Sequence, residues 1–157
     1  MSLDISGPWS KHEADQFLSQ ARFPMRLSCI GSDGYPRVVS LWFRYESDTL
    51  LCVTHRNSQL AAILRQNDKV GFEISPNEPP YFGLRGQGQV SLEPLGNRST
   101  LEELLHLYLG NAKSSLADWL LSRSEEELLV SVKPHRYYSW DYRERMAAAA
   151  AQTTTSN

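Results

Sequence analysis

The sequence predicts a mostly β, α+β protein in which one antiparallel sheet of six strands curls into a barrel and carries a few covering helices. Two observations predict this class. Apolar and polar residues alternate in short segments bounded by glycine, proline, asparagine or aspartate, as in strands that bury one face. Leucine, alanine and phenylalanine recur at helical spacing in other segments, which are mostly grouped apart from the strands.

Six segments have the strand pattern. A turn at Asp33-Gly34 joins the first two into a hairpin, and a turn at Ser47-Asp48 leads into the third. The fifth strand contains Gly83, Gly86 and Gly88, which predict bending or close backbone approach. The predicted strands cover residues 25–30, 37–45, 50–54, 69–75, 81–93 and 128–142.

Helices are predicted from capping residues and spacing. Ser10 followed by Glu13 has the form of a capping box, and the helix that it starts ends before Pro24. Further helices are expected over 60–64, 101–109 and 116–121. The chain has 157 residues, 41% of them hydrophobic, which suits one core. We expect a single domain over 1–145 and a disordered, Ala- and Thr-rich tail over 146–157.

Composition limits the classes of partner. Sixteen basic and eighteen acidic residues give a formal charge of −2, and no basic block indicates nucleic-acid binding. No apolar stretch is long enough to span a membrane, and the first residues lack the features of a signal peptide. Cys29 and Cys52 lie in apolar segments and are expected to be buried thiols. We therefore expect a reduced, cytoplasmic protein with neither a nucleic-acid nor a membrane partner.

Common catalytic signatures are absent from the sequence. The four histidines lack metal-binding spacing, and neither a nucleophile elbow nor a phosphate-binding P-loop occurs. We therefore predict no metal site and assign no catalytic residue. His55 has two interpretations, a proton donor or an exposed loop histidine.

One segment carries polar side chains from the end of a strand to the start of a helix. Thr54 and Ser58 hydroxyls, with the free N–H groups of a helix N-terminus, favour an anion, and Arg56 or Arg65 would add charge. The alternative is that Asn57 or Ser58 only caps the helix. Hairpin pairing of residues 37–42 with this strand would bring an arginine and an aromatic ring close to the same turn, which suits a flat, phosphorylated heterocycle.

An ordered set of short motifs runs from about Met25 to Tyr142. The motifs are Gly34-x-Pro36-Arg37-Val38-Val39 with Trp42-Phe43, Val53-Thr54 with Ser58, Asn67-Asp68-Lys69-Val70, Arg85-Gly86-Gln87-Gly88, and a last strand over 133–142. In this order they resemble the pyridoxamine 5'-phosphate oxidase-like family of FMN-binding split barrels.

The resemblance implies a six-stranded split β-barrel that forms a homodimer with two FMN molecules at the subunit interface. It implies that one strand lies along the flavin ring and that the segment around Ser58 holds the ring edge and the phosphate. Trp42 would either cover the ring or fill the dimer interface. The residues carried over as cofactor-binding candidates are Arg37, Val38, Val39, Ser40, Trp42, Val53, Thr54, Ser58, Gln59 and Trp140.

Two positions depart from the family pattern. Many members have a phosphate-binding lysine two residues after the matched serine, where this chain has Leu60. Trp42 stands where the true oxidase has a substrate lysine, and the C-terminal substrate motif of that enzyme is missing. Pyridoxamine phosphate is therefore not the predicted substrate.

The predicted function is that of an FMN-binding oxidoreductase-like protein, which transfers a hydride between the flavin and a small organic substrate. Two alternatives stay open. The same fold would bind the deazaflavin F420, or haem with His55, His106 or His135 as an axial ligand. Alternatively, the barrel has lost its flavin and is a stress-related binding module, which Leu60 favours.

Overall fold

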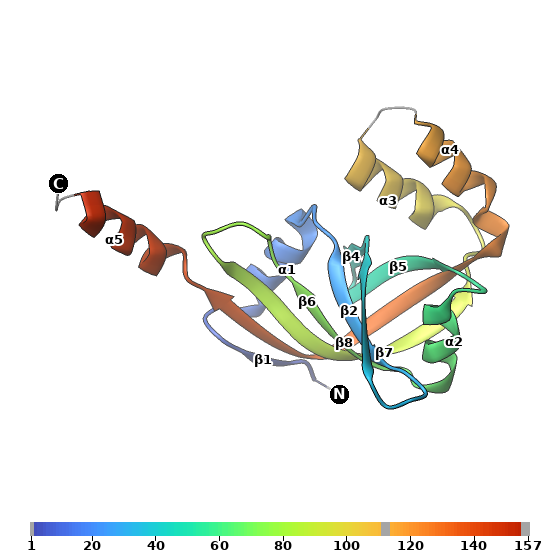
Figure 1. Cartoon of the computed structure of the whole chain (residues 1–157), viewed down its shortest axis with the longest axis horizontal. Helices are drawn as coiled ribbons and strands as arrows, with labels where there is room; N and C mark the ends of the chain where they lie inside the picture. The colour runs from blue at the N-terminus through green and yellow to red at the C-terminus, as the bar shows by residue number, and fades with distance from the viewer. Residues whose placement is uncertain (1, 111–113, 155–157) are drawn as a thin grey trace.

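Strands from the whole length of the chain combine into one curled sheet (Figure 1). The computed structural model describes residues 2–110 and 114–154. Its strands are β1 (Asp4–Ser6), β2 (Met25–Ile30), β3 (Pro36–Leu41), β4 (Arg44–Glu46), β5 (Thr49–His55), β6 (Lys69–Ile74), β7 (Phe82–Pro94) and β8 (Glu127–Asp141). The order across the sheet is β3-β2-β6-β7-β8-β5-β4, and every pairing on this path is antiparallel. The predicted fold class, a curled antiparallel sheet with helices, is confirmed.

Helices gather mainly at the margins of the sheet. They are α1 (Lys11–Gln20), α2 (Gln59–Gln66), α3 (Ser99–Leu109), α4 (Ser115–Ser122), a 3-10 turn η1 (Ser124–Glu126) and α5 (Arg143–Thr154). The pair α3 and α4 lies at one end of the molecule, and α5 extends from the other (Figure 1). The predicted capping box at Ser10 and Glu13 is present at the start of α1.

Two strands differ from the sequence-based prediction. The single strand predicted over 37–45 is two strands, because the chain leaves the sheet at Trp42-Phe43 and re-enters it at the opposite edge. The predicted pairing of residues 37–42 with the strand that ends at Thr54 is therefore wrong: β3 pairs with β2, and only β4 pairs with β5. Strand β1, which pairs parallel with β8, was not predicted, because three residues are too few to show alternation.

One tyrosine holds the break between β3 and β4. The hydroxyl oxygen of Tyr108, on α3, accepts a hydrogen bond from the backbone N–H of Phe43 at 3.1 Å. Its proton faces the carbonyl oxygens of Phe43 and Phe23, each 3.2 Å away. The Phe43 side chain is buried in the core, and the neighbouring Trp42 stacks on the Tyr108 ring. The helical pair is thus fastened to the point where the sheet changes edge.

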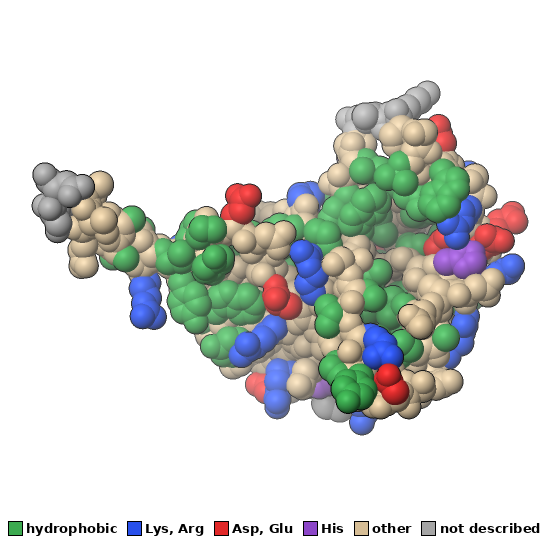
Figure 2. All heavy atoms as spheres, viewed as in Figure 1, with side chains coloured by type: hydrophobic (Ala, Val, Ile, Leu, Met, Phe, Trp, Pro, Cys, Tyr) green, Lys and Arg blue, Asp and Glu red, His purple; other side chains and the backbone are tan. Residues whose placement is uncertain are grey.

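The core has two parts. The main cluster fills the inside of the curled sheet under α1 and α2, and it includes both cysteines. A second cluster lies between the sheet and α3 and α4, around Leu95, Leu101 and Leu105. Apolar side chains also gather on the outside of this helical pair (Figure 2), where Leu116 and Trp119 are exposed. The prediction that both cysteines are buried is confirmed.

Strands β7 and β8 form the longest ladder of the sheet. Its register shifts once, between Gln87 and Gly88, where Pro134 stands opposite Gly88. Proline has no N–H to donate to the ladder, so it is tolerated in a central strand only where a bulge interrupts the regular hydrogen bonding. A Cβ at Gly88 would lie 2.7 Å from the carbonyl oxygen of Lys133. The close backbone approach predicted at this glycine is confirmed.

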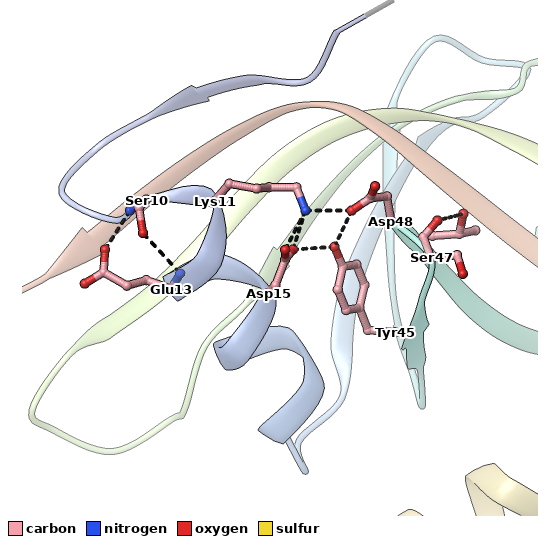
Figure 3. A network of polar contacts seen from close by, with 8 residues as sticks. Ser10, Lys11, Glu13, Asp15, Tyr45, Ser47 and Asp48 are labelled. Carbon is pink, nitrogen blue, oxygen red and sulfur yellow. Dashed lines mark hydrogen bonds and ion pairs between the residues drawn. The ribbon is translucent and has the colours of Figure 1, made fainter.

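A polar network joins α1 to the β4–β5 hairpin (Figure 3). The Nζ atom of Lys11 lies 2.6 Å from carboxylate oxygens of both Asp15 and Asp48, and the Tyr45 hydroxyl donates to the same carboxylates. Ser47 and Asp48 have φ angles of 49° and 60°. This left-handed turn matches the twist of the two strands, but it is sterically unfavourable for residues that have a Cβ atom. The network supplies contacts that help to hold this turn in place.

The C-terminal segment differs from the predicted tail. Residues 146–154 continue helix α5, and residues 155–157 lie outside the described residues. Five consecutive alanines have the highest intrinsic helix propensity, which the prediction from burial alone did not consider. At the start of α5, Arg143 pairs with Asp141 at 2.5 Å and lies over the Phe82 ring. Its hydrogen bond, assisted by that of Trp9, lowers the pKa of Asp141 to about 2.

We predict that Tyr108→Phe destabilises the fold by about 1–2 kcal/mol, because the buried Phe43 N–H loses its acceptor. The measurement is urea unfolding followed by circular dichroism. Tyr35→Phe is the matched control, since the Tyr35 side chain is 70% exposed, and we expect a change within about 0.5 kcal/mol. An equal effect of the two substitutions would contradict the role given to the Tyr108 hydroxyl.

Acid is predicted to weaken the Asp141–Arg143 contact. The pKa of Asp141 is lower in the folded chain than its ordinary value of 3.8, so the stabilisation is present above that value and is lost as pH falls toward about 2. Arg143→Ala should lower stability by up to about 1 kcal/mol at pH 6, with a gap from wild type that shrinks by pH 2. Thermal unfolding across this range measures the gap. A gap that stayed constant would show that the ion pair contributes nothing.

Candidate functional site: the start of helix α2 and the outer face of the sheet

Two hydroxyl groups meet where β5 leads into α2. Thr54 Oγ1 lies 2.9 Å from Ser58 Oγ, which also accepts a hydrogen bond from the backbone N–H of Ala61 at 3.0 Å. Ser58 is therefore the N-cap of α2. Because Ser58 accepts from Ala61, its proton remains available to Thr54 or to a ligand. We call residues 54–59 the α2 entry turn.

Two guanidinium groups flank the α2 entry turn. Arg65 donates to the carbonyl oxygen of Arg56 at 2.9 Å, which holds its guanidinium group against the turn. The guanidinium group of Arg56 lies 4.0 Å from the Glu126 carboxylate. Both side chains are about half exposed, so the charge of Arg56 remains accessible to solvent. Both arginines were predicted from the sequence as possible sources of charge for an anion at this turn, and both belong to or contact the turn in the structure.

Leu60 does not face the turn. Its side chain is 7% exposed and belongs to the main core, on the same face of α2 as Ala61 and Leu64. The helix dipole and the first N–H groups point toward the turn regardless of this side chain. The residue that departs from the family pattern is thus a packing residue here.

Arg37 and Gln59 line one hollow, of about 380 Å³, between the β2–β3 hairpin and α2. The Arg37 guanidinium group donates to Asp33 at 2.8 Å, and both side chains are about half exposed. Arg37 was predicted to lie on the strand along the flavin ring, and Gln59 in the segment that holds the phosphate. The two residues line the same hollow.

Val38 and Trp140 line a larger hollow of about 780 Å³ on the outer face of the sheet, which we call the sheet hollow. It is open because Ser28 and Gly71, which are directly paired, put almost no side chain there. Ser40 lies on this face beside the sheet hollow, opposite Arg26.

A row of charged and aromatic residues crosses the sheet hollow. Arg26 stands opposite Glu73, Glu73 opposite Arg85, and Arg85 opposite Tyr138, with its guanidinium group 4.4 Å from the ring centre. Arg136 also lines the hollow and pairs with Asp4 at 3.0 Å. This row was not identified from the sequence. Alternation within β2 was a usable signal, because Met25 and Leu27 face the core and Arg26 between them must face outward.

The other candidates lie elsewhere. Val39 points inward and packs against the main core. Trp42 stacks on Tyr108 with ring centres 5.2 Å apart and planes 11° apart, and Val53 packs in the same second cluster. The ten candidates therefore fall into three places: the α2 side, the sheet hollow, and packing positions.

His55 is more constrained than an exposed loop histidine. Its side chain is 23% exposed, Nε2 lies 3.1 Å from Glu126, and Nδ1 lies 3.1 Å from the backbone N–H of Asn57. The hydrogen bond from His55 lowers the pKa of Glu126. Within the described ranges, no group of three or more histidine, cysteine or acidic residues is arranged to hold a metal ion. Nor is any helix there long and apolar enough to cross a membrane.

Comparison with solved structures identifies the architecture. A conserved hypothetical protein from Mycobacterium tuberculosis matches with a TM-score of 0.74 and 21% identity over 91% of each chain. An F420 reductase matches with a TM-score of 0.66 and 20% identity, over 78% of this chain and 94% of that one. A proposed pyridoxamine 5'-phosphate oxidase from Listeria innocua matches with a TM-score of 0.60 and 17% identity, over 80% and 94%. The chain has the split-barrel fold.

The likeness is one of fold, since no family model matches the chain and no curated protein matches it in sequence. The same split barrel occurs in a FAD-binding protein from Mesorhizobium loti and in a haem storage protein from Vibrio cholerae, at 18% and 16% identity. Flavin, deazaflavin and haem proteins therefore all occur among the structures that this chain resembles. The resemblance inferred from the sequence is confirmed at the level of the fold.

We predict that Leu60→Lys destabilises the split barrel by about 2 kcal/mol, the value of a buried leucine side chain. Leu60→Met, which keeps an apolar side chain of similar volume, should cost less than about 1.5 kcal/mol. Chemical unfolding of both variants measures the difference. A lysine variant as stable as wild type would show that position 60 is free to face the turn.

Proposed function

We propose that this chain is an FMN-binding, oxidoreductase-like split barrel that acts as a homodimer on a small organic substrate. The observation that carries the proposal is the α2 entry turn, where the paired hydroxyls of Thr54 and Ser58 meet a helix N-terminus. The fold and the cofactors of the matched split barrels support the same class.

The donors at the α2 entry turn fit a phosphate group. A phosphate monoester presents three acceptor oxygens and up to two negative charges. Thr54 and Ser58 supply hydroxyl protons, and the first N–H groups of α2 and the positive end of its dipole favour an anion. Arg65 and Arg56 supply charge from the side of the turn, where Leu60 supplies none. Arg37 and Gln59 would contact the ligand from the neighbouring hollow.

The sheet hollow suits a flat ring. Its volume of about 780 Å³ is in the range of small-molecule sites, and Val38, Tyr138 and Trp140 offer apolar surface. Val38 is 66% exposed in the single chain, and a bound ring or a second copy of the chain would cover this apolar surface. FMN, when bound, supplies hydride transfer, and the chain supplies orientation and electrostatics. No catalytic acid or base is assigned.

The deazaflavin F420 is the second candidate. One observation favours it. Three arginines, Arg26, Arg85 and Arg136, line the sheet hollow together with one acidic residue, Glu73. This excess of positive charge suits an acidic ligand. Haem is less well supported, because both ring nitrogens of His55 already have partners. His106 lies exposed on α3, and His135 lies on the outer face of the sheet beside a hollow of about 560 Å³.

The test mixes the purified chain separately with FMN, F420 and haemin, removes free ligand, and records the visible spectrum and the dissociation constant. Stoichiometric retention of FMN supports the proposal. Retention of F420 or haem in its place moves the function to that cofactor, and retention of none favours a binding module that has lost its flavin. Light scattering of the loaded protein should give the mass of a dimer.

We predict that Thr54→Val and Ser58→Ala together weaken FMN binding at least about tenfold, since each removes a hydrogen bond to a charged group. Riboflavin, which lacks the phosphate, should bind both proteins with similar affinity. Thr49→Val, at the far end of β5, is the control variant and should bind FMN as wild type does. Unchanged FMN affinity in the double variant would sink the assignment of the phosphate to this turn.

A further inference from the structure

Both ring nitrogens of His55, which lies in the α2 entry turn, have hydrogen-bond partners. Nδ1 lies 3.1 Å from the backbone nitrogen of Asn57, two residues further along the chain. Nε2 lies 3.1 Å from Oε2 of Glu126, which belongs to η1. A backbone N–H can only donate, so Nδ1 is the acceptor and the proton of the neutral ring is on Nε2, from which it is donated to Glu126.

The contact with Asn57 reproduces a known turn. Asparagine and aspartate side chains accept the N–H of the residue two positions on, which fixes the direction of the backbone. His55 makes the same contact through its imidazole, and its carbonyl oxygen accepts the N–H of Ser58 at 2.9 Å. One residue thus fixes the N–H groups of both Asn57 and Ser58, immediately before α2 begins.

Glu126 fastens the turn from the other side. Its carbonyl oxygen accepts the N–H of Arg56 at 2.8 Å, and its carboxylate accepts from His55. The same carboxylate lies 4.0 Å from the Arg56 guanidinium group. Strand β8 begins at the next residue, Glu127, which stands opposite His55 in the sheet. The α2 entry turn is therefore anchored to the segment that leads into β8.

We propose that His55 is a positioning residue for the phosphate of the cofactor: held between Asn57 and Glu126, it sets the turn that aims Ser58 and the first N–H groups of α2. This inference rests on the proposed function, because it assumes that the turn binds a phosphate. His55 touches neither the ring nor the reacting atoms in this role. This role differs from those of a proton donor or a haem ligand, which would need a ring nitrogen free to reach the ligand.

The experiment compares FMN with riboflavin, because the ratio of their dissociation constants isolates the contribution of the phosphate. His55→Ala removes both contacts and should reduce the preference for FMN about tenfold, the equivalent of 1.4 kcal/mol. His55→Asn keeps an oxygen that can accept the Asn57 N–H, so it should retain most of the preference. His12→Ala, an exposed histidine on α1, is the matched control.

A general loss of stability would change the affinity for both ligands alike and would leave the ratio unchanged. An unchanged ratio in His55→Ala therefore overturns the inference, as does an equal loss in His55→Ala and His55→Asn. Glu126→Ala removes only the Nε2 contact, which His55→Asn also lacks, so it should likewise retain most of the preference. His55→Leu, which keeps the bulk of the ring without either contact, takes the place of His55→Ala if that variant does not fold. Wild type that binds FMN no better than riboflavin would reject the phosphate site itself, which is a different result from an unchanged ratio in the variant.

Discussion

The connection between β3 and β4 constrains the rest of the structure. These strands stand at opposite ends of the strand order, yet only Trp42 and Phe43 separate them in the chain. Two residues span at most three Cα–Cα steps, about 11 Å, so a flat sheet of this order is impossible. The sheet must curl until its two edges approach. Tyr108 fixes the crossing point through the backbone of Phe43, which also ties α3 to the barrel.

The curl accounts for the two faces of the sheet and for where a ligand could bind. The inner face closes around the main core, and the outer face of β3, β2, β6, β7 and β8 remains open. Small residues at Ser28 and Gly71 hollow this outer face. Helix α2 packs against the main core through Leu60 and Leu64, and its N-terminus follows the end of β5. Packing thus leaves a shallow apolar and basic depression on the sheet and, separately, a turn that carries two hydroxyl groups at the start of α2.

Features formed by residues that are close in the chain could be predicted from the sequence. Features that depend on which strands pair with each other could not. Thr54, Ser58 and Gln59 are close in the chain, so their common position at the start of α2 follows from a strand ending where helical spacing begins. The break at Trp42-Phe43 could not be seen, because apolar alternation continues through it. The row of Arg26, Glu73 and Arg85 depends on pairing among three strands, which no local pattern specifies.

Under the proposed function, the α2 entry turn binds the phosphate of a flavin nucleotide. The turn combines hydroxyl and N–H donors in a fold that also occurs in a FAD-binding protein. A crystal structure of the chain with FMN bound would show where the phosphate lies. We expect phosphate oxygens within hydrogen-bonding distance of Thr54 and Ser58, with the ring toward the outer face of the sheet. A phosphate bound at the arginines of the sheet hollow, away from α2, would contradict it.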